Sequence, residues 1–163
     1  MKRSIISFKC ISDRVSYLKL RIQGGKATFF NAYAPHAGYE YGVRQLFFSS
    51  LQQTISSGGS FGMKMLVGDL NARIHNSAGG QNHVFGPHCF SNPGYKASHC
   101  PDSNRELQLE LCISLGFCVA NTFLQSDPHK QIAYHELWSL PVAEVSHRNF
   151  AQLDHLATFD PSF

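Results

Sequence analysis

The sequence predicts an α/β sandwich of the α+β type, built from helices and mixed, mostly antiparallel sheets. Several short segments alternate apolar and polar residues, as strands with one buried face do. Two longer segments between them repeat their apolar residues at helical spacing. Because strands follow one another without a helix between them at both ends of the chain, this order disfavours a doubly wound parallel sheet.

The first part of the chain carries four of these patterns. They are a strand at 15–22, a hairpin turn at 23–26, a strand at 27–34 and a helix between Val43 and Ile55. Pro35 ends the second strand, because proline has no N–H to donate to a sheet. The glycine- and serine-rich segment 56–60 ends the helix.

The next apolar segment, 63–67, predicts a buried strand. A long polar loop from Arg73 to Pro101 follows, and loops of that length in a compact domain are usually functional or disordered. Ser103 and Glu106 then form a capping box for a helix that ends at Gly116. Three further strands are predicted, at 117–120, 133–138 and 150–158.

Length and composition predict one domain over residues 1–163. The net charge of +3 permits nucleic-acid binding without requiring it, since no basic run exceeds Lys2-Arg3. The five cysteines stand in apolar contexts, which is typical of reduced thiols in an intracellular protein, nuclear or cytoplasmic. No segment has the length and apolar character of a membrane span, so no membrane partner is expected.

Two further patterns are better explained as ordinary loop residues. His88-Cys89 and His99-Cys100 suggest zinc, but their spacing matches none of the usual zinc-binding layouts. Residues 58–62 match the Gly-x-Ser-x-Gly pattern of a serine hydrolase, which must follow a strand and open a helix. Here the segment follows a helix and opens a strand. We therefore assign neither zinc ligands nor a nucleophile to these segments.

Polar residues suited to catalysis stand at or near three predicted strand ends: Tyr33, Asp69 with Asn71, and Asp154. Gly68 permits a tight turn before Asp69. A carboxylate and an amide two residues apart can point the same way and handle a water and a phosphate. Each residue also has a structural alternative, as a turn former, a core aromatic or a strand-end charge.

These residues lie in segments that resemble the endonuclease/exonuclease/phosphatase superfamily. Within it they most resemble the endonuclease domains of non-LTR retrotransposons, with apurinic endonucleases as more distant relatives. The resemblance runs from Asp13 to Phe159. Its segments are Asn31-Ala32-Tyr33-Ala34-Pro35, Leu66-Val67-Gly68-Asp69-Leu70-Asn71-Ala72, Ser103-Asn104-Arg105-Glu106-Leu107, Asn121-Thr122-Phe123, Trp138 and Gln152-Leu153-Asp154-His155.

The resemblance implies a partial four-layer α/β sandwich with two mixed, mostly antiparallel sheets, and Mg²⁺-dependent hydrolysis of DNA phosphodiester bonds. It implies that Asp69 orients or deprotonates the attacking water, and that Asn71 and Tyr33 hydrogen-bond the phosphate. Asp154 would hold a catalytic histidine in its working tautomer. Asn104, at a helix start, would contact a phosphate or another part of the substrate.

The sequence departs from the superfamily pattern in three places. Members begin with an Asn-bearing strand and a strand whose Glu binds Mg²⁺, and they end in an Asp-His pair. Asp13 stands in the wrong context to replace that Glu, and His155 would point away from Asp154 in a strand. We therefore expect a single incomplete domain with no metal ligand assigned, inactive or nearly so, with exposed sheet edges and an incompletely covered core.

Two other functions stay open. The long loop and the helix after it carry basic residues, including Arg73, Lys96 and Arg105, suited to binding phosphates without cleaving them. The superfamily also includes phosphatases and phosphodiesterases that act on small or lipid substrates.

Overall fold

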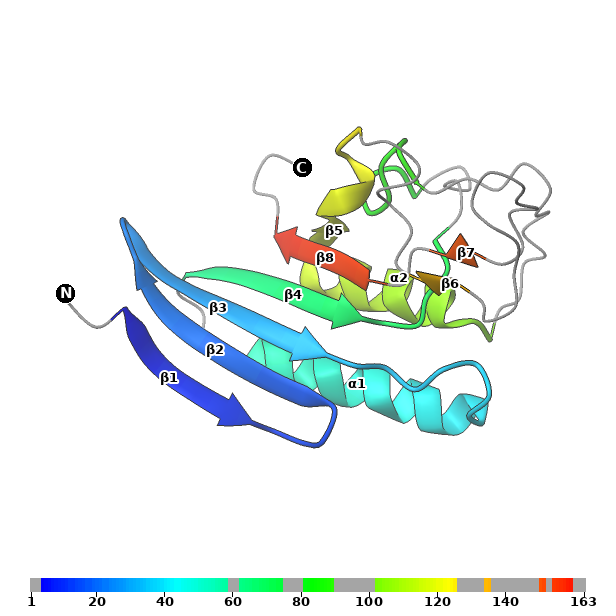
Figure 1. Ribbon diagram of the computed structural model, residues 1–163, viewed down its shortest axis with the longest axis horizontal. Coiled ribbons are helices and arrows are strands. Elements are labelled where there is room, and N and C mark those ends of the chain that lie inside the picture. Colours follow the sequence, from blue (N-terminus) through cyan, green and yellow to red (C-terminus); the bar gives the residue numbers. More distant parts are fainter. Residues whose placement is uncertain are drawn as a thin grey trace.

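A mixed sheet of six strands forms the centre of the fold, in the order β1-β2-β3-β4-β8-β5 (Figure 1). The structure is a computed structural model that describes residues 4–58, 62–74, 81–89, 102–125, 134–135, 150–151 and 154–159. The strands are β1 (Ile5–Cys10), β2 (Val15–Ile22), β3 (Gly25–Ala32), β4 (Met63–Asp69), β5 (Phe117–Val119) and β8 (Asp154–Phe159). Only β3 and β4 run parallel among these neighbouring pairs, so the predicted mixed, mostly antiparallel sheet is confirmed.

Both described α-helices, α1 (Tyr41–Ser57) and α2 (Asn104–Leu115), pack on one face of this sheet (Figure 1). Phe30, Leu66 and Ala157 are cross-strand neighbours on that face, and each has an exposed fraction of 0%. They belong to the same core cluster as Leu51 of α1 and Leu107 of α2. Burial of each large apolar side chain stabilises the fold by about 2 kcal/mol, so this layer supplies most of the stability.

The opposite face of the sheet is also apolar, although both helices lie on the other side. We call it the open face. Its large apolar residues follow from the register and include Phe8, Leu18, Leu20, Phe29, Met63, Met65, Val67 and Leu156. Of these eight, Phe8 is 64% exposed and Met63 46%, and the other six are half-buried. The smaller residues Ala27 and Cys118 on the same face are buried. The expectation of an incompletely covered core therefore agrees with the described residues.

The helix ends follow the sequence closely. Ser103 precedes α2, and its Oγ accepts a hydrogen bond from the Glu106 N–H at 3.4 Å. Gly116 ends the helix with a φ of 65°, a left-handed conformation that glycine adopts without strain. The predicted cap and stop of this helix are both confirmed.

Three expectations differ from the structure. The described residues form one six-stranded sheet and one sheet of only two short strands, whereas a four-layer sandwich has two large sheets. The remaining strands, β6 (Tyr134–His135) and β7 (Phe150–Ala151), only pair with each other. β1 was not predicted, because Ser7 and Lys9 interrupt its apolar pattern. The long loop is not all loop: Val84 and Phe85 are fully buried, and Phe85 bridges to Val119 of β5.

Smaller expectations have mixed outcomes. Cys112 and Cys118 are buried and in no disulfide, as predicted, whereas Cys10 is exposed on the edge strand β1. Trp138 and the His99-Cys100 dipeptide, which was considered as a zinc site, lie outside the described residues. No described helix is long and apolar enough to cross a bilayer.

Candidate catalytic edge

Two strands end and a third begins at one edge of the sheet: β3 and β4 end there, and β8 starts there (Figure 1). Asp69, the last residue of β4, pairs directly with Asp154, the first residue of β8. The Ala34 N–H donates to the Asp69 carbonyl oxygen at 2.9 Å, which extends the contact between the ends of β3 and β4. Tyr33, Asp69, Asn71 and Asp154 therefore all lie at this end of three neighbouring strands, and we call these four residues the polar edge.

The alternation of side chains separates Asp154 from His155. Val67 and Leu156 are paired on the open face, so Asp69 and Asp154, two residues further along, lie on the same side. His155 pairs with Gly68 and faces the helices, where it is 3% exposed. The prediction that His155 points away from Asp154 is confirmed.

The Gly-Asp-Leu-Asn motif, residues 68–71, is a tight turn in which the Asn71 backbone bonds to the Asp69 carboxylate. Gly68 has a φ of +127°, and a Cβ there would collide with the carbonyl oxygen of Ala32. Asn71 has a φ of 49°, and its N–H donates to Asp69 Oδ1 at 2.8 Å. The Asn71 side-chain Nδ2 donates to the Ala34 carbonyl oxygen at 2.8 Å. The structural and catalytic interpretations are therefore compatible, because the turn fixes the position of the Asp69 carboxylate.

The environment of Asp69 makes it a better base than an exposed aspartate. Partial burial raises the pKa of the Asp69 carboxyl, the hydrogen bond from the Asn71 N–H lowers it, and the nearby Asp154 charge raises it. The net direction is upward. A carboxylate with a raised pKa accepts a proton from water more readily.

Asn104 holds the polar edge to the helices. Its side chain is 4% exposed, and its Nδ2 donates to the carbonyl oxygens of Pro35 at 2.8 Å and Leu70 at 3.2 Å. Its Oδ1 accepts from Nη1 of the buried Arg44 at 3.1 Å. The resemblance implied that Asn104 contacts the substrate, but its polar atoms are bonded to protein groups and it is buried beneath the edge. This geometry suits positioning of the segments after β3 and β4.

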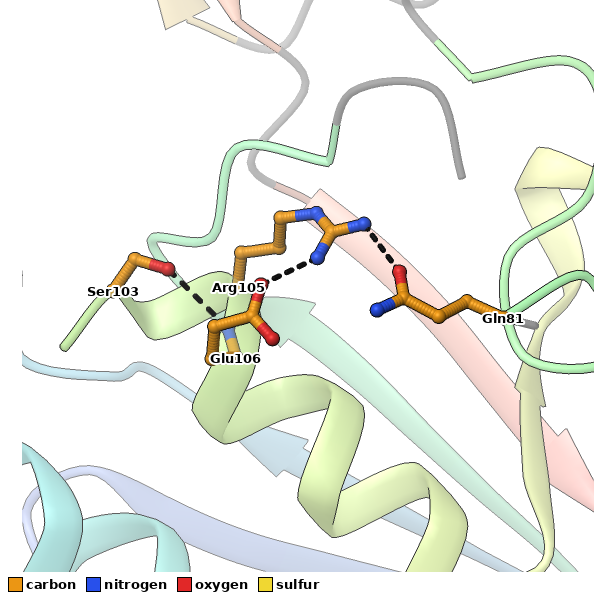
Figure 2. A network of polar contacts seen from close by, with 4 residues as sticks. All are labelled: Gln81, Ser103, Arg105 and Glu106. Carbon is orange, nitrogen blue, oxygen red and sulfur yellow. Dashed lines mark hydrogen bonds and ion pairs between the residues drawn. The ribbon is translucent and has the colours of Figure 1, made fainter. Parts of the chain in front are cut away.

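The start of α2 also anchors part of the long segment after β4. Figure 2 shows Arg105 between Glu106 and Gln81, with hydrogen bonds of 2.5 and 2.6 Å. The Arg105 guanidinium also lies 5.0 Å from the centre of the Phe85 ring. These contacts hold segment 81–89 against the helix, so the structure gives Arg105 a packing role. Lys96 lies outside the described residues.

Two residues without a predicted role support β8. The His155 Nε2 donates to the Ala72 carbonyl oxygen at 2.9 Å, and burial lowers the pKa of His155 to about 4. Asn121 donates from Nδ2 to the Asp154 carbonyl oxygen at 3.5 Å and accepts the Leu156 N–H at Oδ1, at 3.1 Å. The sequence signal for Asn121 was its place directly after a strand, in the Asn-Thr-Phe segment.

The residues at this edge fit a metal ion only in part. Mg²⁺ prefers oxygen ligands, and it is often held by one or two carboxylates together with a substrate phosphate. Asp69 and Asp154 supply two carboxylates on neighbouring strands. Within the described residues, however, no group of three or more His, Cys, Asp or Glu side chains is placed to hold a metal. Asp69 and Asp154 are therefore the described residues that would face a metal ion at this edge.

Comparison with known proteins rests on the fold. No family profile and no curated protein matches the sequence. An endonuclease/exonuclease/phosphatase family protein from Leptotrichia buccalis C-1013-b matches 97% of this chain with a TM-score of 0.57 and 10% identity. The fold is that of the endonuclease/exonuclease/phosphatase superfamily.

Two further solved structures share this superfamily fold. A humanized TDP2 from D. rerio matches 97% of the chain with a TM-score of 0.52 and 9% identity. The AP endonuclease LMAP from Leishmania major matches 90% of it with a TM-score of 0.50 and 15% identity. The chain covers 51%, 53% and 46% of these three structures, so it spans about half the length of each.

Proposed function

We propose that the polar edge is a phosphodiesterase site of the endonuclease type, with DNA as its substrate class. The observation that carries this proposal is the cross-strand pair of Asp69 and Asp154, with Asn71 bonded to Asp69 at the end of β4. The superfamily fold supports it, since one matched structure is an AP endonuclease. Of the functions considered, hydrolysis of a phosphodiester makes the best use of two carboxylates beside an amide and a phenol.

Each residue of the polar edge has a chemical role in this proposal. Asp69, whose carboxyl pKa is raised, orients the attacking water and accepts its proton. The Asn71 amide, which has a second hydrogen beyond its bond to Ala34, and the Tyr33 hydroxyl donate to phosphate oxygens. Asp154 supplies the second carboxylate, and Asn104 is a positioning residue beneath them.

We propose that hydrolysis by this chain is slow or absent. A bound Mg²⁺ would supply positive charge to the phosphate, and Asp69 and Asp154 are the described carboxylates that would face it. Two carboxylates can hold such an ion beside a substrate phosphate. The low rate follows instead from the Glu and the Asp-His pair that the resemblance implies and this sequence does not match, because losing a base or a metal ligand costs orders of magnitude in rate. The same proposal includes two finer features: a retrotransposon-type endonuclease, and a partial four-layer sandwich that contains a second sheet.

DNA binding tests the location of the site. An Asp69→Asn substitution removes a negative charge facing the phosphate, so duplex DNA at low ionic strength should bind several-fold more tightly. Glu110→Gln is the matched control, because Glu110 is an exposed carboxylate in the middle of α2. It should leave the affinity near that of the wild type. Equal affinities for the wild type and Asp69→Asn would exclude the polar edge as the phosphate site.

A plasmid-nicking assay tests the level of activity. Supercoiled plasmid with Mg²⁺ and the full chain should be nicked at or near the background rate. Nicking that is clear in the wild type and in Glu110→Gln, but lost in Asp69→Asn, would show an active enzyme and overturn the proposal of low activity. Background nicking together with DNA binding at the polar edge agrees with a protein that binds DNA and cleaves it little.

A further inference from the structure

A cation and two aromatic rings lie next to the polar edge. The guanidinium carbon of Arg14 is 5.4 Å from the centre of the Tyr33 ring and 5.5 Å from that of the Tyr39 ring. Its Nη1 donates to the Tyr33 carbonyl oxygen and its Nη2 to the Tyr39 hydroxyl, both at 3.3 Å. One guanidinium therefore orders both rings. We call Arg14, Tyr33 and Tyr39 the Arg14 cluster.

The rings of the Arg14 cluster are ordered and yet exposed to solvent. Tyr33 is 52% exposed and Tyr39 41% exposed, whereas Arg14 is half-buried beside them. Exposed aromatic rings contribute little to the core, and the described core cluster contains neither of these tyrosines. The Tyr39 ring also packs in a T-shaped contact with the His36 ring, with 4.8 Å between the ring centres. The part of the two tyrosine rings that stays exposed is available to a ligand.

The backbone around the Arg14 cluster is held in place from several sides. The Tyr39 carbonyl oxygen accepts from Nε of the buried Arg44 at 3.1 Å, and the Tyr39 N–H donates to the His36 carbonyl oxygen at 3.0 Å. The Tyr33 N–H donates to the Arg14 carbonyl oxygen at 2.9 Å. Ordering the rings before a ligand arrives lowers the entropy cost of binding.

We propose that the Arg14 cluster stacks an unpaired nucleobase of a DNA strand whose phosphodiester lies at the polar edge. Every base has a flat π-face, and stacking on exposed aromatic rings beside an arginine is how single strands are bound without sequence preference. Tyr33 belongs both to the cluster and to the polar edge, so a base and its neighbouring phosphate can occupy the two together. This inference rests on the proposed function only for the position of the phosphate.

Two oligonucleotides of equal length separate stacking from charge. One is a labelled oligo-dT, and the other has the same phosphates but abasic sugars. Fluorescence anisotropy with the full chain at low ionic strength should give an affinity for oligo-dT that is roughly tenfold higher than for the abasic strand. Equal affinities for the two strands, or no binding of oligo-dT, would overturn the proposal.

Substitutions at Tyr39 test the ring itself. Tyr39→Ala should reduce the affinity for oligo-dT to that for the abasic strand and leave abasic binding unchanged. Tyr39→Phe keeps the ring and should retain most of the preference for bases. Phe8→Ala is the matched control, because Phe8 is an aromatic residue on β1, 64% exposed. It should leave both affinities unchanged.

Different variants test the stacking site and the phosphate site. If Tyr39→Ala weakens both strands equally, or if Tyr39→Phe is as defective as Tyr39→Ala, the ring does not stack a base. Asp69→Asn, in contrast, should strengthen the binding of both strands by the same factor, since both carry the same phosphates. Loss of that effect with the base preference intact would contradict the phosphate site and leave the stacking site standing.

Discussion

Asp154 and His155 are adjacent in sequence, but they lie on opposite faces of β8 and differ in environment. Asp154 is exposed at the polar edge, whereas His155 is buried against the helix layer with its Nε2 bonded to Ala72. The bond to a carbonyl oxygen requires the hydrogen on Nε2. The His155 Nδ1 is buried and has no hydrogen-bond partner among the described residues. A buried neutral imidazole of this kind supports folding instead of proton transfer.

His155 should make the stability of the protein depend on pH. Its pKa falls from 6.5 to about 4 on folding, so the unfolded chain binds a proton more readily. Its contribution is present in full above pH 6.5 and is lost as the pH falls towards 4. The loss should reach roughly 3 kcal/mol. Urea denaturation of the wild type at several pH values in this window measures it.

A His155→Gln variant provides the comparison, because glutamine can still donate to Ala72 but does not titrate. The variant should have a much flatter dependence of unfolding free energy on pH. His83→Gln, at an exposed histidine, should keep the wild-type slope. An unchanged slope in His155→Gln would show that other groups cause the dependence.

The residues of the polar edge were predictable one by one, but their contacts were not. Asp69 and Asn71 carry a local signal, because a glycine and two polar side chains end an apolar strand. The pairing of Asp69 with Asp154 depends on the register of strands far apart in the sequence. Arg14 has no local signal at all, since its contacts with Tyr33 and Tyr39 form only when the β1–β2 turn lies beside the end of β3.

At the scale of elements, the first turn of α2 has two separate functions. Ser103 caps the helix locally, whereas Asn104 connects α2 to α1 through Arg44 and to the segments after β3 and β4 through backbone carbonyls. The cap satisfies one helix N–H. The Asn104 side chain satisfies groups from three other parts of the chain.

Substitution of these two neighbours should therefore have unequal effects. Ser103→Ala should lower the free energy of unfolding by about 1 kcal/mol, the usual cost of a lost cap. Asn104→Ala should cost about 2–4 kcal/mol, because it leaves two buried carbonyl oxygens without a donor. Urea denaturation measures both values. If Asn104→Ala lowers the free energy of unfolding by no more than Ser103→Ala does, Asn104 does not hold these segments together.

The predictability of the elements follows from where their stability arises. β2 and α2 were predicted almost to the residue, because side-chain alternation, helical spacing and caps are local properties. β1 is an edge strand whose side chains are mostly exposed. Its stability comes from backbone pairing with β2, and its own sequence has no apolar pattern that predicts a strand. Val84 and Phe85 form too short an apolar pair to predict that the loop packs into the core.

At the scale of the whole molecule, the two faces of the sheet should contribute very differently to stability. Phe30 of β3 lies on the face of the sheet that the helices cover and has no exposed surface. Phe8 lies on the open face and is 64% exposed. Phe30→Ala should therefore cost about 3–5 kcal/mol through loss of burial and creation of a cavity. Phe8→Ala should cost less than about 1 kcal/mol.

An apolar dye should distinguish the faces in a second way. The native protein should increase the fluorescence of such a dye at its open face, and Phe8→Ala should reduce the increase with only a small fall in melting temperature. Equal destabilisation by the two phenylalanine substitutions would show that the open face is covered as well as the helix layer is.

The hydrogen bonds of the Asn104 side chain should also affect local unfolding of the polar edge. Loops at functional sites usually exchange their amide hydrogens through small local fluctuations. Here the buried Asn104 side chain, on α2, bonds to the segments after β3 and β4 and to Arg44 of α1. The Ala34 N–H lies between these segments and donates to the Asp69 carbonyl oxygen. Its hydrogen should exchange only when the entire domain unfolds, at the rate of the most protected core amides. The region proposed to act on DNA would then be among the last parts of the protein to open.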